Sequence, residues 1–126
     1  LHNHTYEVQN GLHDLKGTLS RMPGIKLGPD LNWLIRAGVD PVWFINTYGK
    51  QMVYMHIRDQ GSDHKWTEAV GSGVTDFKAI AAALDQQHFA GRAAIELAFD
   101  NPPVNPLRED WKNSLEYVRK TFGWAS

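Results

Sequence analysis

Histidine and carboxylate side chains recur along the chain at intervals close to the length of one strand and one helix. His2 and His4 lie on the first predicted strand, and Asp30 directly follows the second. His56 lies near the end of the third strand, and Glu96 lies towards the end of the fourth. Imidazole nitrogen combined with carboxylate oxygen suits Mn²⁺, Fe²⁺, Co²⁺ or Zn²⁺. Because the carboxyl ends of parallel strands meet at one mouth of a barrel, this spacing indicates a divalent metal site.

Each of these residues also has a structural interpretation. A single histidine in a buried strand usually belongs to the core, and Asp30 could simply cap the turn that follows it. Glu96 within AAIELA is harder to explain in this way, because a carboxylate among apolar side chains has a large desolvation cost unless it is paired or bound to a metal. His56 within MVYMHI raises the same question. The joint occurrence at equivalent points of consecutive units favours one shared site.

Residues near these positions are further candidates. Arg58 and Asp59 directly follow the third strand, where they could hold a substrate hydroxyl or phosphate group or form a salt bridge within the loop. Trp33 and Trp66 could form the floor of a sugar pocket, although aromatic residues in α/β proteins usually pack in the core. The sequence GSG at 71–73 lacks the spacing of a Walker motif that cradles phosphate. Three histidines are expected to face solvent: His13, His64 and His88.

The composition limits the classes of function. The 126 residues include 13 basic and 14 acidic side chains, so the net charge of −1 provides no basic field for nucleic acid or an anionic membrane. No apolar run approaches the roughly 20 residues that span a bilayer. The chain contains no cysteine, which excludes disulfides, thiol catalysis and zinc–thiolate sites and fits a reducing compartment. We therefore expect a cytoplasmic protein.

The elements that must position the candidate residues alternate between strand and helix. A β-favouring alternation of polar and apolar residues predicts a strand over 1–8. Further strands are predicted over 25–28, 52–57 and 93–98, and the 52–57 run is apolar enough to be buried on both faces. Apolar spacing and capping signals predict helices over 12–19, 31–37, 41–48, 76–84 and around 111–118. Asp40 and Asp76 mark two helix starts, and Asn10 with Gly11 marks a turn. Trp111, Leu115 and Val118 share one side of the last helix.

Alternating strands and helices predict an α/β fold with parallel strands. Four such units are half of a TIM barrel, which usually has about 250 residues. A half barrel leaves strand edges open and apolar side chains uncovered. We therefore expect residues 1–126 to be half of a barrel from a longer chain; two copies that complete each other, or an open sheet, are the alternatives.

Four segments follow one another in an informative order: LHNHTYE, GPDLNWLIRAGVDP, YMHIRD with the downstream VGSGVTDF, and AAIELAF before a helix that contains KNSLEYVRK. Together they resemble the sugar phosphate isomerase/epimerase superfamily, the xylose isomerase-like TIM barrels. The resemblance covers nearly the whole chain and matches the C-terminal half of that barrel, strands five to eight. It implies one divalent ion (Mn²⁺, Co²⁺, Mg²⁺ or Zn²⁺) held by four side chains: His2, Asp30, His56 and Glu96.

Two positions depart from the pattern of this superfamily. Many members have glutamate in place of His2, and in the epimerases with paired glutamates these two residues exchange the proton on opposite faces of the substrate. Histidine often follows the metal-binding aspartate by three residues, where this chain has Trp33. The first departure argues against a symmetric two-base epimerisation, and the second leaves the particular sugar unassigned.

The resemblance implies a metal-dependent isomerase or epimerase that acts on a keto-sugar or related carbohydrate through an enediolate. Glu96 is expected to act as ligand and proton shuttle, and His4 to relay protons or orient a hydroxyl group. Arg58, Trp33 and His4 are the candidate substrate-binding residues.

Two alternatives remain open at this point. Dehydration of a keto-inositol, or elimination from a 3-keto-glycoside, needs the same stabilised enolate, and a barrel fragment without catalytic function is the other possibility. The expected partner is a small carbohydrate, with no nucleic acid and no membrane. The site is expected to need the missing N-terminal half barrel or a second copy of the chain.

Overall fold

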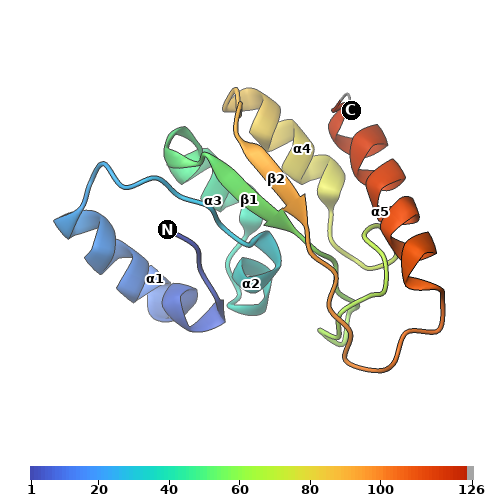
Figure 1. Cartoon of the computed structure of the whole chain (residues 1–126). Helices are drawn as coiled ribbons and strands as arrows, with labels where there is room; N and C mark the ends of the chain where they lie inside the picture. The colour runs from blue at the N-terminus through green and yellow to red at the C-terminus, as the bar shows by residue number, and fades with distance from the viewer. Residues whose placement is uncertain (125–126) are drawn as a thin grey trace.

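The computed structural model describes residues 1–124 and shows an α/β arrangement (Figure 1). The elements follow in the order α1 (Thr5–Arg21), α2 (Leu31–Arg36), α3 (Pro41–Tyr48), a 3₁₀ turn (Gly49–Gln51), β1 (Tyr54–Ile57), α4 (Phe77–Gln86), β2 (Arg92–Ile95) and α5 (Leu107–Phe122). Helices that follow one another in the chain also contact one another in space. This order places α2 against β1 and the candidate site at the ends of the strands.

The sheet of the described residues contains two parallel strands, β1 and β2. Their register runs from Tyr54 opposite Arg92 to Ile57 opposite Ile95. The predicted strand over 25–28 is present only as isolated parallel bridges, from Leu27 to Met52 and from Asp30 to His56. Three segments therefore run in parallel side by side, in the order 27–30, β1 and β2.

Helix starts confirm the capping signals in the sequence. The Asp40 side chain accepts a hydrogen bond from Val42 N at 2.9 Å before α3, and Asp76 accepts one from Ala79 N at 3.0 Å before α4. These carboxylates satisfy backbone N–H groups that a helix leaves without partners in its first turn.

The predicted strand over 1–8 is wrong beyond its first residues, because α1 begins at Thr5. His4 is the N-cap residue, and its backbone N–H donates to the Glu7 carboxylate in a capping box that favours the helix. Only the start of the chain is extended: Leu1 O accepts a hydrogen bond from Gly28 N at 2.7 Å. The expected turn at Asn10 and Gly11 interrupts α1, where both residues have a positive φ.

Burial along the two strands also differs from the expectation. In β1, buried Met55 and Ile57 alternate with half-buried Tyr54 and His56, so the strand is not buried on both faces. Strand β2 ends at Ile95, which places Glu96 one residue beyond the strand.

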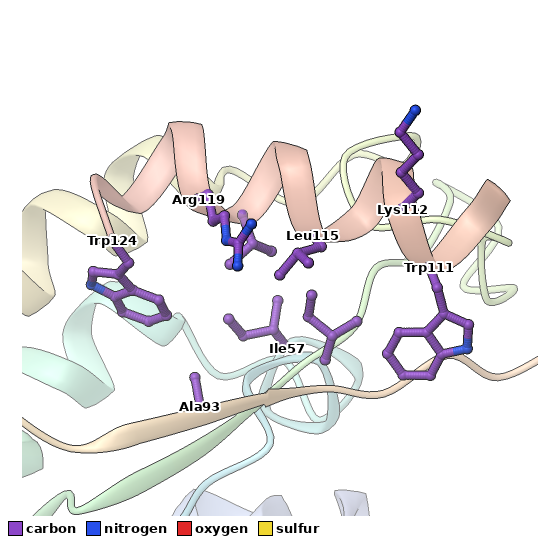
Figure 2. A pocket seen from close by; sticks show the side chains of 9 residues that line it. Ile57, Ala93, Trp111, Lys112, Leu115, Arg119 and Trp124 are labelled. Carbon is purple, nitrogen blue, oxygen red and sulfur yellow. The ribbon is translucent and has the colours of Figure 1, made fainter. Parts of the chain in front are cut away.

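Helix α5 covers the sheet less completely than its sequence suggests. Val118 is buried, but Trp111 and Leu115 on the same side are 43% and 41% exposed. These two side chains line an apolar groove of about 640 Å³ between α5 and the sheet, opposite Ile57, Ala93 and Ile95 (Figure 2). The groove leaves apolar side chains of both the helix and the sheet open to solvent.

Helices of the described residues are all too short or too polar to cross a membrane.

Candidate metal centre

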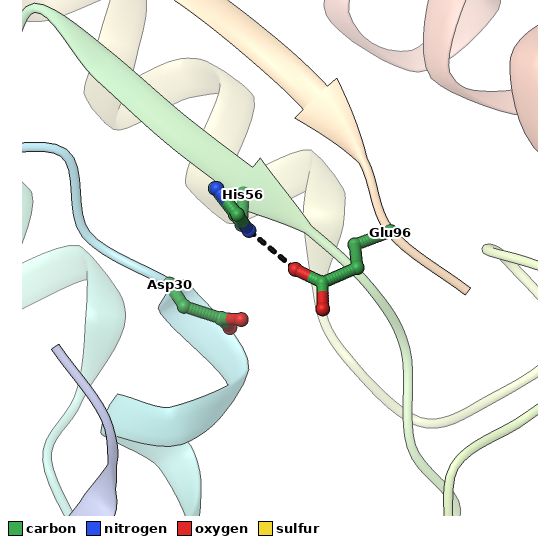
Figure 3. Close-up of side chains that lie close together, drawn as sticks. All are labelled: Asp30, His56 and Glu96. Atoms are coloured by element: carbon green, nitrogen blue, oxygen red, sulfur yellow. Dashed lines mark hydrogen bonds and ion pairs between the residues drawn. The ribbon is translucent and has the colours of Figure 1, made fainter. Parts of the chain in front are cut away.

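Asp30, His56 and Glu96 converge at the carboxyl ends of the three parallel segments (Figure 3). Each offers one potential ligand atom, and these three atoms all lie within 4.8 Å of one another. The backbone explains the convergence: Asp30 is bridged to His56, and Glu96 N donates a hydrogen bond to Ile57 O at 2.9 Å. The sheet register therefore carries three residues that are distant in sequence to one place.

Asp30 is fully buried and caps α2. Its Oδ1 accepts hydrogen bonds from the backbone N–H groups of Asn32 at 3.0 Å and Trp33 at 3.3 Å. Burial raises the pKa of Asp30, and the charge of Arg58 and the two backbone donors offset this rise only in part. The sequence left open whether Asp30 caps a helix or belongs to the candidate site. In the structure it does both.

His56 and Glu96 form a direct hydrogen bond from Nδ1 to Oε2. Burial raises the pKa of Glu96, but the hydrogen bond to His56 and the positive charge of Arg58 outweigh that effect and leave the pKa below its usual value. The Glu96 side chain is 42% exposed, so the expectation of a carboxylate enclosed by apolar neighbours is wrong. Its position beyond the end of β2 explains this exposure.

Arg58 connects the two carboxylates. Its Nε lies 2.8 Å from Asp30 Oδ2, and its Nη2 lies 2.5 Å from Glu96 Oε1. The Arg58 side chain is only 8% exposed. Arg58 therefore supplies positive charge to the candidate centre, and its ion-pair partners are Asp30 and Glu96 rather than the adjacent Asp59.

The two N-terminal histidines lie at different places. His2 is beside His56, with ring centroids 4.7 Å apart, and its Nδ1 contacts Gly28 O at 3.2 Å. Because a carbonyl only accepts, this contact leaves Nε2 as the acceptor nitrogen of the neutral ring. His4 is exposed and stacks on Tyr6, its ring centroid lies 5.1 Å from that of His2, and it is not part of the cluster of Asp30, His56 and Glu96. The structure thus brings His2 next to the cluster and leaves His4 at its margin.

Trp33 and Trp66 stand together beside Arg58. Their rings meet edge to face with centroids 4.9 Å apart. The Arg58 guanidinium lies 5.4 Å from the Trp33 ring and 4.7 Å from the Trp66 ring, and Arg36 lies 3.4 Å from the Trp66 ring. Both tryptophans are only partly buried, so they form an aromatic and cationic wall rather than part of the core.

Three buried amide side chains near the centre were not identified from the sequence. Asn3 Oδ1 accepts from Asp30 N at 3.2 Å, and Asn32 Nδ2 donates to Arg58 O. Gln60 Nε2 in turn donates to Asn32 Oδ1 at 2.7 Å. Only the HNH sequence hinted at Asn3, because an amide carries no charge or spacing signal of its own. The expectation that His13, His64 and His88 face solvent is confirmed.

The donor set fits a divalent cation. Asp30 Oδ2 is buried and accepts no hydrogen bond of good geometry among the described residues, although it forms an ion pair with Arg58 Nε. A raised pKa in this buried acid means that the available positive charge does not fully offset its desolvation. A further cation, bound by two carboxylates and an imidazole, would compensate it. These ligand types suit Mn²⁺, Co²⁺, Zn²⁺ or Mg²⁺.

Neither a protein-family model nor a curated protein matches this chain. Solved structures do match. A xylose isomerase domain protein from Alicyclobacillus acidocaldarius aligns with a TM-score of 0.73 and 20% identity, covering 89% of this chain and 43% of the other. A sugar phosphate isomerase/epimerase from Parabacteroides distasonis gives a TM-score of 0.72 and 20% identity, over 94% and 44%. An L-ribulose 3-epimerase gives 0.69 and 19%, over 96% and 42%.

These similarities establish the fold. The chain has the fold of part of the xylose isomerase-like and sugar phosphate isomerase/epimerase structures, as its sequence motifs imply. It spans less than half the length of each of these three neighbours.

Replacing Arg58 tests whether its charge is required at the centre. Arg58→Gln should lower the free energy of unfolding by about 3 kcal/mol at neutral pH, because it leaves the buried Asp30 carboxylate unpaired. The loss should shrink in acid, where the carboxylates become protonated. Urea unfolding at several pH values measures both effects. Arg92→Gln, at an exposed position of β2, is the control; an equal loss in both variants would contradict the assignment.

Proposed function

We propose that this chain is the metal-binding half of a TIM-barrel carbohydrate isomerase or epimerase. The observation that carries the proposal is the convergence of Asp30, His56 and Glu96 at the carboxyl ends of neighbouring parallel segments. Barrel enzymes build their active sites at this end of the strands. The fold shared with known sugar isomerases and epimerases supports the same class of reaction.

One divalent ion is held, in this proposal, by Asp30, His56 and Glu96, with His2 as the fourth ligand. The position of His2 beside His56 supports its role, since its contact with Gly28 O leaves Nε2 as the acceptor nitrogen. When bound, the ion supplies Lewis-acid stabilisation of negative charge on a substrate carbonyl oxygen.

Glu96 acts as the proton shuttle between carbons of a keto-sugar. Its lowered pKa keeps it ionised near neutral pH, and its exposure makes it accessible to a substrate. It removes the proton from the carbon next to the carbonyl group, which leaves an enediolate. Return of the proton to the neighbouring carbon, with transfer of the hydroxyl proton to the former carbonyl oxygen, completes an isomerisation. An epimerisation needs, besides Glu96, a second proton donor on the opposite face of the substrate.

Substrate recognition is assigned to three side chains around this shuttle. Arg58 donates to substrate oxygens, and Trp33 provides an aromatic face for the C–H groups of a sugar. His4 lies 5.9 Å from Trp33 between ring centroids, and it orients a hydroxyl group or relays a proton from the exposed margin.

The presence of His2 favours a second candidate reaction. With glutamate absent from position 2, the paired glutamates of the epimerases are reduced to Glu96 in this half of the site. A single base suffices for elimination of water from a keto-inositol or of the aglycone from a 3-keto-glycoside. This lyase activity is therefore the alternative, and a barrel fragment used only for binding is the remaining one.

The apolar groove between α5 and the sheet supports a half-barrel assignment for residues 1–126. Four strand–helix units would form this half, and the units of the other half would cover Trp111, Leu115 and the open edge of β2. The neighbours are more than twice as long as the matched region, which leaves room for such units within one chain. In this protein, the units of the other half come from the same polypeptide or from a second copy. We assign the protein to the cytoplasm.

Metal binding tests the ligand assignment. Glu96→Gln and His56→Ala should each weaken Mn²⁺ binding at least tenfold, because each removes one ligand. Isothermal titration of the intact polypeptide measures the affinity. Glu116→Gln, at an exposed position of α5, should bind Mn²⁺ like the unaltered protein. Unchanged metal occupancy in both ligand variants would remove the proposal.

The fate of one proton tests the reaction. The Mn²⁺-loaded protein, incubated with L-ribulose in D₂O, should introduce deuterium next to the carbonyl group, and Glu96→Gln should slow this at least a hundredfold. Mass spectrometry of a parallel incubation in H₂O separates the two candidate reactions, since an isomer keeps the mass of the sugar and elimination does not. Formation of an isomer in which that carbon keeps its original hydrogen would contradict the enediolate, and absence of both products would favour the non-catalytic alternative.

A polar substitution in the groove tests whether it is covered. Leu115→Glu should lower the free energy of unfolding by about 2 kcal/mol if another unit covers the groove. The loss should be less than about 0.5 kcal/mol if the groove is open to solvent. Val104→Glu, at an 89% exposed position outside the groove, is the control. Analytical ultracentrifugation then tells whether the covering unit is a second copy. A neutral effect of Leu115→Glu would contradict the half-barrel assignment.

A further inference from the structure

The buried carboxylate of Asp59 collects four backbone N–H groups from both ends of the loop that follows β1. Oδ1 accepts from Gln60 N at 2.9 Å and Thr75 N at 3.3 Å. Oδ2 accepts from Gly71 N and Gly73 N, both at 2.9 Å. Asp59 is only 3% exposed, and none of the ion pairs of the described residues includes it. Backbone amides therefore provide most of the stabilisation of this anion.

The GSG segment is shaped for this internal carboxylate rather than for an external phosphate. A Cβ atom on Gly73 would lie 2.5 Å from Asp59 Oδ1 and would also collide with Gln60 O. Gly71 has a φ of +93°, and a Cβ there would meet the Tyr117 ring at 2.5 Å. Both glycines are required so that the loop can approach Asp59.

The hydrogen bonds to Asp59 hold the loop that carries Trp66. They also hold the end of β1, where Arg58 lies. Between the two anchor points, Trp66 N donates to Asp100 Oδ2 at 2.7 Å, and its ring stands 4.7 Å from the Arg58 guanidinium. Arg58 itself lies between Ile57, which is paired with β2, and the immobilised Asp59. Its carbonyl oxygen accepts from Asn32 Nδ2. The main chain on both sides of Arg58 is thus held in place.

We propose that Asp59 is a positioning residue for substrate binding: by holding both ends of the 60–75 loop, it aims Arg58 and Trp66 at the candidate centre. This inference rests on the proposed function for the identity of the ligand, a hydroxy-ketone. Asp59 does not touch the substrate or the metal. It acts through Arg58, so its loss weakens sugar binding and leaves the metal ligands, which are placed by the sheet register, unaffected.

Asp59→Asn tests the proposal, because the amide keeps the shape and cannot accept from all four donors. Hydrogen exchange of the amides of Gly71, Gly73 and Thr75 should become at least tenfold faster. Acrylamide should quench the fluorescence of the variant more strongly, and Trp66→Phe should abolish this difference. Asp63→Asn is the control, since Asp63 is an exposed acid in the same loop. These loop readouts do not depend on any substrate.

A double-mutant cycle separates positioning from a general loss of structure. In the Mn²⁺-loaded protein, Asp59→Asn should weaken L-ribulose binding at least tenfold while Mn²⁺ affinity changes less than threefold. In an Arg58→Gln background, Asp59→Asn should weaken sugar binding less than threefold, since only its effect through Trp66 remains. An equal effect in both backgrounds, or an equal loss of Mn²⁺ affinity, would overturn the proposal.

Two further outcomes are decisive. If the unaltered protein binds neither Mn²⁺ nor L-ribulose, the proposed function fails while the loop readouts still decide whether Asp59 positions Trp66; unchanged exchange and quenching would then overturn that role. If Asp59→Asn does not fold, Gly73→Ala replaces it, because it keeps the carboxylate and forces the loop away. Gly73→Ala should show the same faster exchange and the same dependence on Arg58, and its failure to do so would overturn the proposal.

Discussion

The Arg58 guanidinium between two carboxylates is the interaction on which the candidate centre depends. Asp30 is fully buried, and Glu96 faces it across the strand ends, so the two negative charges would repel each other where water screens them poorly. Arg58 contacts both of them, through Nε on one side and Nη2 on the other. Because Asp30 and Arg58 are both nearly buried, each of these two charges requires the other, whereas Glu96 is also reached by solvent. The raised pKa of Asp30 indicates that the charge of Arg58 does not fully offset the desolvation of this carboxylate.

Buried amide side chains hold the cluster together where the sheet is too small to do so. The described residues form only two regular strands of four residues each, and the segment that carries Asp30 is joined to them by isolated bridges. Asn3, Asn32 and Gln60 supply the missing connections, because their amides bond to backbone groups of neighbouring segments and to each other. Such a network stabilises one arrangement only when its members find partners.

The sequence predicts the local structure best where a short motif acts within a few residues. Asp40 and Asp76 start helices as predicted, since capping needs only the next turn of backbone. The recurrence of Asp30, His56 and Glu96 predicts a cluster because parallel strands bring equivalent positions together. The amides Asn3 and Asn32 could not be predicted, because their importance arises from partners distant in the chain.

Two predictions were wrong, each for its own reason. The alternation of polar and apolar residues in the 1–8 segment suggested a strand, but the bond from His4 to Glu7 starts a helix, so a polar contact overrode the pattern. Glu96 looked buried because its neighbours in sequence are apolar, yet it lies past the end of β2 and is 42% exposed.

The central claim is that Asp30, His56 and Glu96 share one cation. A crystal of the intact polypeptide soaked with Mn²⁺ and measured at the manganese absorption edge tests it most directly. The account predicts a single strong anomalous peak in contact with all three side chains; a peak elsewhere, or none, would contradict it.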